Sequence, residues 1–406
     1  MLVPTEAAGN NKEVNLRILV LTLGTFAIGT GTFVVTGILG GVSEDLSVSV
    51  GTAGYLVTVF AAAYAVGSPL LVAATDRVAR RRLLSAVLAV FAVANAAATV
   101  APTFSLLLGT RVLAALGAAV LTPVAGAVAA ELAPPEHRGQ ALSFVLGGLS
   151  VSWVVGIPLG TVVGDNYGWR ASFILAAALS VAAALAVRTL LPDVENTSSA
   201  TGLASKLAVA KRSAVLIAVS ITALGVAAGF VVLTYVRPLL EDLTGFGGTG
   251  IGWMLLLFGL ASVTGTALGG YVADRLGYGR SVVPILVVLT ASLLSFSLLP
   301  AIEVGSLIAV LGTGTALVTW SVVGFALIPL QQYRLIDVAP EDENEVLSLN
   351  ASAIYLGQGL GSGLGSLVLG YASLSSLGWA GALCAAVALL VLALGGRPRK
   401  KRATSN

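Results

Sequence analysis

The main pattern along the chain is a series of long apolar runs separated by short polar segments. Polar and apolar residues do not alternate within these runs, as they would in the strands of a membrane barrel. Many runs reach about 20 residues, which as an α-helix crosses a hydrocarbon layer of about 30 Å. The pattern therefore predicts an all-α membrane protein. We expect twelve transmembrane helices, near residues 15–40, 52–73, 83–101, 104–130, 140–164, 170–190, 213–238, 250–272, 282–300, 304–332, 347–371 and 378–396.

A duplicated motif divides these spans into two sets of six. It occurs once as Gly67, Asp76 and Arg77 and again as Gly265, Asp274 and Arg275. The two aspartates are 198 residues apart (274 − 76), close to half of the 406-residue chain. A second repeated set is formed by the glycines of the fifth and eleventh spans, namely Gly156, Gly160, Gly164, Gly357, Gly361 and Gly365. The duplication predicts two pseudo-symmetric six-helix bundles that face each other.

The polar segments set the expected domain boundaries. We expect an N-terminal bundle over residues 1–190 and a C-terminal bundle over residues 213–396. Residues 191–212 read as a cytoplasmic linker that ends in a short interfacial helix, because apolar residues alternate with lysine and arginine near its end. Residues 397–406 form a basic tail, expected in the cytoplasm.

Composition and charge exclude a water-soluble protein and set an orientation. With 57% hydrophobic and 10% charged residues, and a mean hydropathy of +0.96, the chain cannot cover a soluble globule with polar surface. Of the 22 lysines and arginines, all but Arg111, Arg170 and Arg237 fall on one side if both termini are cytoplasmic. Membrane orientation therefore explains the net charge of +3 better than nucleic-acid binding does.

The sequence contains few residues that could form a metal, nucleotide or catalytic site. Cys384 is the single cysteine and His137 the single histidine, so neither a disulfide within the chain nor a cysteine or histidine metal cluster is expected. No G-x-x-x-x-G-K-[ST] motif is present to cradle the phosphates of ATP. We therefore expect no cofactor, no metal and no enzyme activity.

Several motifs resemble those of the major facilitator superfamily, and the resemblance covers nearly the whole chain. Within it the chain looks like the twelve-span bacterial drug and sugar efflux branch, which includes proton antiporters. The segment from Gly67 to Arg82 resembles the family's signature between spans 2 and 3, although Ala79 stands where a glycine is usual. The other matching residues are Arg111, Val112, Leu113 and Gly117 in span 4, Gly147, Gly156, Pro158 and Gly160 in span 5, and Tyr235, Pro238, Thr244 and Gly245 after span 7.

The resemblance implies roles for several of these residues. Gly67, Asp76 and Arg77, with the repeated Asp274 and Arg275, would form a cytoplasmic latch that braces the outward-facing state; the alternative is that these charges only set topology. Spans 1, 4, 7 and 10 would line the substrate pathway. Candidate pathway residues are Arg111, Thr32, Thr36, Tyr235 and Trp320, with Asn350, Tyr355 and Gln358 from span 11.

Three features of the spans each allow two interpretations. Arg111 is costly in a membrane, so it either faces a central cavity and binds solute or is held by backbone carbonyls. The glycines of span 5, including Gly164, with Pro158 predict either a bend that seals the cavity or ordinary close packing. For Arg237 we favour an interface anchor over a gate.

The sequence therefore predicts a secondary transporter in a bacterial cytoplasmic membrane, a monomer that exports a small organic solute such as a drug, sugar or nucleobase. Family resemblance favours proton antiport. However, Thr32 stands where relatives often have a glutamate, and no aspartate or glutamate lies in the middle of a span, which leaves Asp76, Glu131 and Asp165 near span ends. An ion-independent facilitator or solute exchanger is the first alternative, and a transport-inactive receptor or scaffold is the second.

Overall fold

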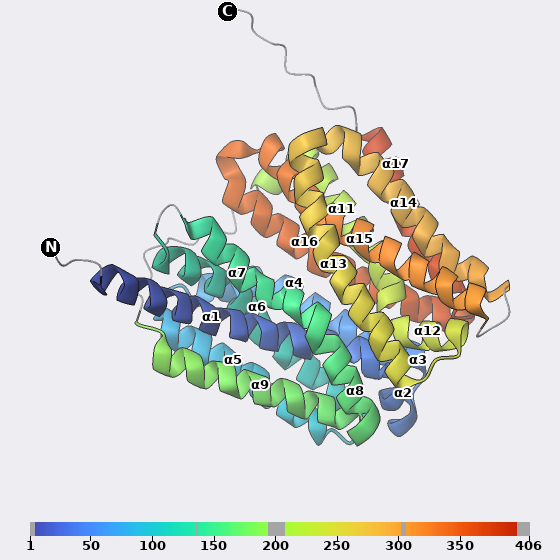
Figure 1. Ribbon diagram of the computed structural model, residues 1–406, viewed down its shortest axis with the longest axis horizontal. Helices are drawn as coiled ribbons and strands as arrows, with labels where there is room; N and C mark the ends of the chain where they lie inside the picture. Colours follow the sequence, from blue (N-terminus) through green and yellow to red (C-terminus); the bar gives the residue numbers. More distant parts are fainter. Residues whose placement is uncertain (1–4, 135–136, 194–207, 302–305, 396–406) are drawn as a thin grey trace, which may run out of the picture.

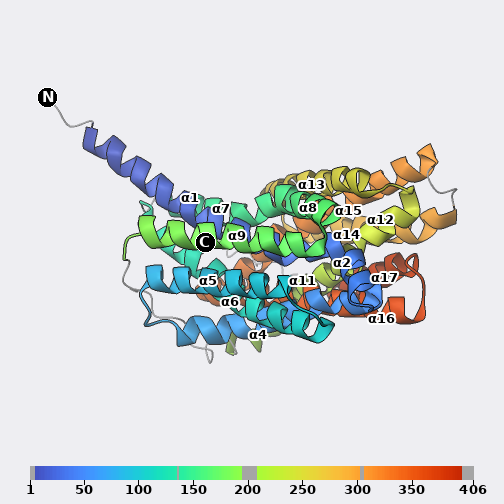
Figure 2. The same cartoon turned by 90° about the horizontal axis from the view of Figure 1, so that it is seen from below.

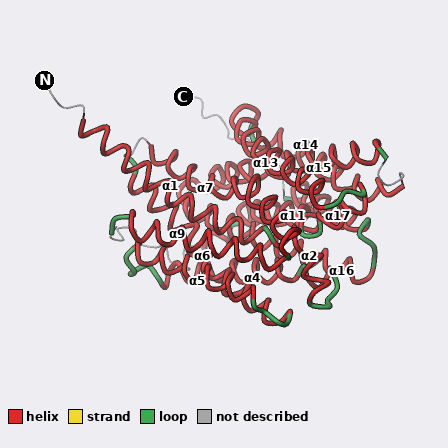
Figure 3. The backbone as a smooth tube through the Cα atoms, turned by 60° about the horizontal axis from the view of Figure 1, so that its bottom comes forward, coloured by secondary structure: helices red, strands yellow, loops and turns green. Residues whose placement is uncertain are grey.

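The computed structural model describes the chain except for residues 1–4, 135–136, 194–207, 302–305 and 396–406 (Figure 1). Helices make up nearly all of the described part, which contains no strand (Figure 3). The basic tail and most of the expected linker, including the first part of its interfacial helix, lie outside the described residues.

The helices follow the predicted order. In the N-terminal half they are α1 (Thr5–Phe33), α2 (Val35–Asp45), α3 (Val50–Ala53), α4 (Tyr55–Ala74), α5 (Arg80–Thr99), α6 (Phe104–Leu132), α7 (Arg138–Val151), the π-helical turn η2 (Ser152–Gly156), α8 (Ile157–Tyr167) and α9 (Trp169–Leu190). In the C-terminal half they are α11 (Ser213–Leu233), α12 (Val236–Thr244), α13 (Gly248–Leu276), α14 (Tyr278–Leu298), η3 (Leu299–Ala301), α15 (Leu307–Val338), η4 (Pro340–Asp342), α16 (Glu343–Tyr371) and α17 (Ser376–Leu394).

Eleven segments of the described chain are long and apolar enough to cross a membrane. They match eleven of the twelve predicted spans. The remaining span is α16, which has 29 residues but whose glycines and serines lower its mean hydropathy. The fold therefore has the twelve long segments that the sequence predicts.

Spans 1 and 7 are each broken into two helices, which the sequence did not predict. Span 1 breaks at Val34, between α1 and α2, and span 7 breaks at Thr234 and Tyr235, between α11 and α12. The breaks are 200 residues apart (234 − 34), close to the spacing of the duplicated aspartates. The two halves thus share a local irregularity as well as a motif.

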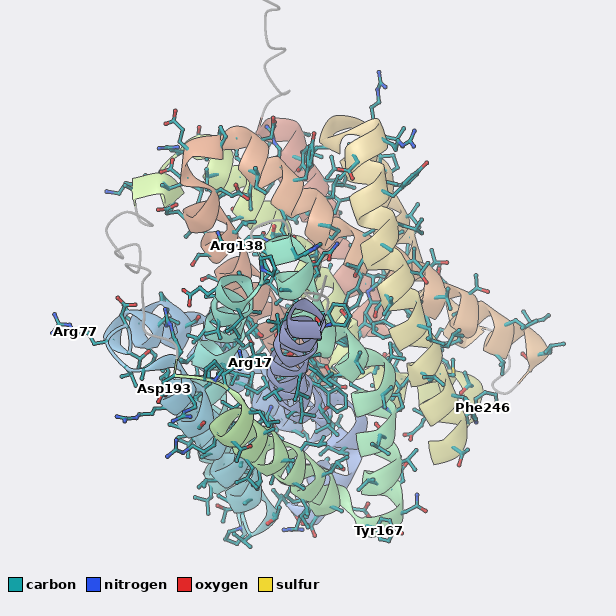
Figure 4. The ribbon with its side chains drawn as sticks, turned by 60° about the vertical axis from the view of Figure 1, so that its left-hand side comes forward. Arg17, Arg77, Arg138, Tyr167, Asp193 and Phe246 are labelled. Carbon is teal, nitrogen blue, oxygen red and sulfur yellow. The ribbon has the colours of Figure 1, made fainter. Side chains whose placement is uncertain are left out.

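The two bundles meet at one end and diverge toward the other (Figure 1). At the end where they diverge, α1 begins and α17 ends, and we call it the basic end because Arg17, Arg77 and Arg138 lie there (Figure 4). At the other, which we call the far end, α2, α3, α8 and α12 come together. The bundles are joined on two sides, where α4 packs against α16 and where η2 and α8 pack against α13 (Figure 2).

Glycine ridges bring neighbouring spans into close contact in both halves. A Cβ added at Gly156, Gly160 or Gly164 would overlap a side chain of α1 or α2 or of the Val34 break between them. At the corresponding positions of span 11, a Cβ at Gly357, Gly361 or Gly365 would overlap α11 or Tyr235. Span 5 therefore packs on span 1 as span 11 packs on span 7, through small residues that let helices approach closely.

Candidate substrate pathway between the two bundles

Arg111 of α6 is one of the largest fully buried side chains, with 1% of its surface exposed. Its Nη1 donates to the carbonyl oxygen of Gly31 at 3.0 Å, and its Nη2 donates to that of Thr32 at 3.3 Å. The guanidinium also lies over the ring of Phe60, 4.6 Å from its centroid. The side chain is therefore held by backbone carbonyls and an aromatic face, the second of the two interpretations given by the sequence.

These carbonyls belong to the last turn of α1, directly before the break at Val34. The C-terminal end of a helix carries partial negative charge, so a cation is favoured there. Thr36, just beyond the break, turns its hydroxyl back to the carbonyl of Phe33 at 2.8 Å. Arg111, Thr32 and Thr36 thus stabilise the break in span 1.

A charged bridge closes the far end between the two bundles. Arg237 of α12 donates from Nη1 to Asp165 of α8 at 2.5 Å and to the carbonyl oxygen of Gly37 in α2 at 2.7 Å. Its Nε donates to Glu241 in its own helix at 2.9 Å. The Asp165 carboxylate also lies against Gly248, the first residue of α13, where a helix favours negative charge. Arg237 therefore links the bundles instead of serving only as an interface anchor.

A second set of contacts at this end joins α3 to spans 7 and 11. The fully buried Tyr235 directs its hydroxyl to the carbonyl oxygens of Ser362 at 3.1 Å and Gly51 at 3.3 Å. The hydroxyl of Ser366 donates to the same Gly51 oxygen at 2.7 Å, and that of Ser362 donates to Gly54 O at 2.9 Å. These uncharged bonds add to the closure of the far end.

Aromatic rings fill the space between the bundles halfway along the spans. Trp153 in η2 lies 4.1 Å from the ring of Phe33, centroid to centroid. On its other side it meets three rings of the C-terminal bundle, Phe325 at 5.3 Å, Phe258 at 6.1 Å and Phe230 at 6.5 Å. Phe33, Trp153, Phe230 and Phe258 are buried, and Phe325 is partly buried against them.

Toward the basic end, a pocket of about 270 Å³ opens between the bundles. Its walls come from α4, α6, α7 and α16, and they are apolar with a few hydroxyl groups. The lining residues include Tyr64, Ser68, Thr122, Leu142, Leu347 and Ser352. At one side of the pocket Tyr64 stacks on Tyr355 of α16, with ring centroids 3.4 Å apart. The structure is therefore closed at the far end and hollowed toward the basic end.

Comparison with known proteins identifies the family. The model of the Major Facilitator Superfamily matches residues 21–357, most of the chain. The chain belongs to this superfamily. It is thus a multi-pass membrane transporter, as the motifs predicted.

Relatives of this superfamily member come from several bacteria. The MFS-type transporter YbcL of Bacillus subtilis is 30% identical over 374 residues, 92% of this chain and 94% of its own. The inner membrane transport protein YdhP of Escherichia coli is 31% identical over 389 residues, which are 95% of this chain and 97% of that protein. A chloramphenicol resistance protein of Streptomyces lividans is 36% identical over 263 residues, which are 64% of this chain and 67% of that protein.

Solved structures of other transporters share the fold. The partially occluded inward open conformation of the xylose transporter XylE from Escherichia coli matches with a TM-score of 0.69 at 15% identity, over 95% of this chain and all of that one. A bacterial homologue of the human lysosomal transporter Spinster, in an inward-facing and occupied conformation, matches with the same TM-score of 0.69 at 15% identity, over 93% and 94%. At this level of identity the likeness concerns the fold alone.

The superfamily motif between spans 2 and 3 lies at the basic end. Gly67 is buried in α4, where a Cβ would press against α6. Asp76 and Arg77 follow in the turn after α4, and Asp274 and Arg275 are exposed in the last turn of α13. Arg77 points outward from the edge of the bundle (Figure 4). The predicted latch residues and the far-end bridge therefore lie at opposite ends of the molecule.

The other predicted residues are spread between the bundle interiors and the surface. Trp320 belongs to the ring cluster, 5.0 Å from Phe258. Asn350 is buried within the C-terminal bundle, where its Oδ1 accepts from Thr222 at 2.8 Å, and Gln358 is buried in the same helix. In span 5, Pro158 is the second residue of α8 and follows the π-helical turn η2 without a break in the helical backbone, so its missing N–H removes one helix hydrogen bond.

Sequence reasoning missed two features of this pathway. It treated Asp165 only as a possible proton carrier and did not pair it with Arg237, which lies 72 residues away. It also passed over Trp153, although a tryptophan in the middle of a glycine-rich span was a usable signal. Gly147 was predicted as a motif residue of span 5, but no neighbouring helix lies close to it, since an added Cβ there would meet nothing within 4 Å.

Proposed function

We propose that the protein exports a small organic solute from the cytoplasm by alternating access, in exchange for protons. The observation that supports this most directly is the pair of unequal ends: specific bonds join the bundles at the far end, and a pocket opens between them toward the basic end. If the basic end faces the cytoplasm, as the positive-inside rule favours, this is the state that takes up solute from inside.

Efflux is supported by the relatives. One of them is a chloramphenicol resistance protein, and another is an inner membrane transport protein. A drug, sugar or nucleobase of moderate lipophilicity would suit apolar walls with a few hydroxyl groups such as those of Ser68 and Ser352. A bacterial cytoplasmic membrane is the location that we propose, with both termini inside.

In this proposal the predicted latch and the far-end bridge act in alternation. Asp76, Arg77, Asp274 and Arg275 would join the bundles at the basic end when it closes, with Gly67 letting α4 and α6 stay close. The bond between Arg237 and Asp165 would then break, and the far end would open. Two such packings, each held by its own contacts, are what alternating access requires. Arg111 would keep the break in span 1 fixed while the bundles move.

Solute exchange without protons is the direct alternative to proton antiport. Every aspartate and glutamate that the structure describes lies in a loop or near a helix end, so a carboxylate in the middle of a described span does not carry the proton. Two of the predicted proton carriers, Glu131 and Asp165, lie near helix ends. A solute exchanger that ignores protons fits this arrangement as well.

Flux measurements in proteoliposomes test the proposal. The purified full-length chain would be offered labelled chloramphenicol, xylose and a nucleobase, with and without an imposed pH gradient. We expect flux of at least one solute. This flux should accelerate when the side that the solute leaves is more alkaline than the side that it enters, because protons then flow in the opposite direction. Flux that is equal at all gradients would establish the exchanger or facilitator, and no flux of any solute would favour a receptor or scaffold.

A further inference from the structure

Three buried polar side chains meet inside the C-terminal bundle, where α11, α15 and α16 pack together (Figure 1). They are Thr222 of α11, Gln331 of α15 and Asn350 of α16, each with at most 1% of its surface exposed. The Thr222 hydroxyl lies 2.8 Å from Asn350 Oδ1 and 3.3 Å from the carbonyl oxygen of Ala218. Gln331 Nε2 donates to the same Ala218 oxygen at 3.1 Å. The three side chains are therefore grouped around one turn of α11.

The two amides lie opposite each other in the hairpin formed by α15 and α16. Gln331 is seven residues before the last residue of α15 (338 − 331), and Asn350 is seven residues after the first residue of α16 (350 − 343). Only residues 339–342 separate the two helices, which therefore run antiparallel. At 1.5 Å per residue, both amides lie at the same depth, about 10 Å from the helix ends.

Each amide has one polar atom without a partner. Gln331 Oε1 and Asn350 Nδ2 are buried and form no hydrogen bond with any residue that the structure describes. An unpaired amide atom in an apolar interior is costly, so native proteins satisfy nearly all such atoms. One of these two atoms is an acceptor and the other a donor. A small molecule that both donates and accepts would satisfy them together.

Apolar side chains shield the two amides from both ends of the molecule. Val215, Leu335 and Val346 lie about one turn closer to the basic end, and all three are fully buried. Toward the far end, the buried Leu327 packs against Gly225. A molecule held between the amides would therefore be enclosed by the bundle and separate from the pocket between the bundles.

We infer that one water molecule is bound between Gln331 and Asn350 as a fixed part of the C-terminal bundle. It accepts from Asn350 Nδ2 and donates to Gln331 Oε1. Its other hydrogen donates to the Thr222 hydroxyl oxygen, which completes the three hydrogen bonds usual for buried water. The water thereby ties spans 10 and 11 to span 7, whatever solute the chain moves.

The inference holds for either orientation of the Asn350 amide. If its two end atoms exchange places, Nδ2 donates to the Thr222 hydroxyl and Oδ1 becomes the unpaired atom. The same water then donates one hydrogen to Oδ1 and the other to Gln331 Oε1. A water is therefore held between the amides in both cases.

A sodium ion is the other small ligand that these oxygen atoms could hold. It would leave Asn350 Nδ2 unpaired, and no carboxylate lies among the printed partners of Thr222, Gln331 and Asn350 in the described chain to balance its charge. An unbalanced charge inside a membrane protein is costly. Water satisfies both unpaired atoms and brings no charge, so it fits the site better.

A structure of the purified full-length protein, at a resolution that shows ordered water, tests the inference directly. We expect one isolated feature of density about 2.7–3.2 Å from both Gln331 Oε1 and Asn350 Nδ2. Direct contact between the two amides, or the absence of density between them, would overturn the inference. Density contacted only by oxygen atoms, together with an unfolding temperature that rises when sodium replaces choline in the buffer, would overturn it in favour of a cation.

Thermal unfolding of variants gives a second measurement. Gln331→Met and Asn350→Leu keep the approximate size of the side chain and remove the amide. Each should lower the unfolding temperature, because it leaves the other amide with an unpaired atom. The double variant should lower it by clearly less than the sum of the two single shifts, since both unpaired atoms are then gone.

The matched control is Asn95→Leu, which removes a buried amide of the N-terminal bundle that donates to the Phe91 carbonyl at 2.7 Å. Combined with Gln331→Met, it should give additive shifts, because the two sites share no partner. Additive shifts for the pair Gln331→Met and Asn350→Leu as well would contradict a shared ligand. Direct contact of the amides would also couple them, so the density identifies the water, and it decides alone if a variant does not fold.

Discussion

A guanidinium in the middle of a membrane protein needs partners, and Arg111 has them within its own bundle. Two of its nitrogens donate to the carbonyl oxygens of Gly31 and Thr32, and two rings lie beneath it, those of Phe60 and Phe173. Hydrogen bonds that involve a charged group contribute about 1.5–3 kcal/mol each, more than those between neutral groups. The residue therefore holds α6 to the broken end of α1.

Replacing Arg111 should consequently cost stability as well as transport. We expect Arg111→Ala to lower the free energy of unfolding by about 2–3 kcal/mol, because both carbonyl bonds are lost while the cost of burying the charge is relieved. Arg111→Lys should lie between wild type and Arg111→Ala, since an ammonium lacks the planar fork that reaches both oxygens. Thermal unfolding of the purified protein provides the measurement. An unchanged unfolding temperature combined with lost transport would instead indicate that Arg111 contacts solute directly.

At the far end, the Asp45 carboxylate is linked to α9. Arg170 donates to it at 2.5 Å and the Trp169 indole at 3.2 Å, and these bonds hold the pKa of Asp45 below its ordinary value. A lowered pKa favours the charged, folded form. The pair therefore contributes stability above the unfolded pKa of about 3.9 and loses that stability as the pH falls through the lower folded value.

The comparison of wild type with Asp45→Asn should thus depend on pH. We expect wild type to unfold at a higher temperature near neutral pH and the two curves to converge under acid conditions, with a small effect because both side chains are partly exposed. Arg170→Gln, which removes the main cause of the shift, should behave like Asp45→Asn. A difference between wild type and Asp45→Asn that stays constant down to the lowest pH would contradict this account.

The sequence identified the cations whose burial in a membrane costs free energy, but not the groups that they bind. Arg111 and Arg237 stood out because a cation near a membrane interior is unusual. Their partners were hidden, since backbone carbonyls such as those of Gly31 and Gly37 carry no signal in the residue type. Asp165 was visible as a charge, but only the packing of α8 against the C-terminal bundle brings it to Arg237.

At the scale of helices, the close packing of spans 5 and 11 depends on the spacing of their glycines, and this spacing could be recognised in the sequence. Glycines four residues apart predicted close contact of span 5, and the same spacing recurs where span 11 meets span 7. The break in span 1 was not readable, because Val34 lies in a run that stays apolar and contains no proline. In span 7, Pro238 lacks the N–H that a continuous helix would donate to the Thr234 carbonyl, but the sequence analysis did not use this signal. The π turn ends two residues before Pro158, where the sequence allowed a bend in span 5, but its π-helical form had no signal of its own.

Gly259 gives a sharp test of the contact between η2 and α13. A Cβ there would meet the backbone of Trp153 and Val154, which cannot rotate away as a side chain could. We expect Gly259→Ala to destabilise this closed packing by about 1–3 kcal/mol, the usual range for overpacking. Gly252→Ala is the matched control on the same helix, because its Cβ would lie at an ordinary 3.6 Å from Val162. Equal unfolding temperatures for the two variants would contradict the contact.

For the whole molecule, the two halves are duplicated in fold but unequal in their contacts. The duplicated aspartates predicted two matched bundles, and the shared breaks in spans 1 and 7 strengthen that relation. Which end is closed could not be predicted, because one sequence must be compatible with both packings. In this structure the far end is held by the Arg237 bridge and by Tyr235, while a pocket opens toward the basic end.

The most direct test of the alternating-end account is a pair of distances measured together by spin labels in a Cys384→Ser background. One pair, at the exposed positions Gly40 and Asp242, reports on the far end. The other, at the exposed positions Gly139 and Gly279, reports on the basic end.

Asp165→Arg places a like charge beside Arg237. We expect the far-end distance to lengthen and the basic-end distance to shorten in the same sample, and the double swap Asp165→Arg with Arg237→Asp to restore both distances. Distances that stay fixed in the single variant, or that change in the same sense at both ends, would contradict the rocking of two bundles about a central site.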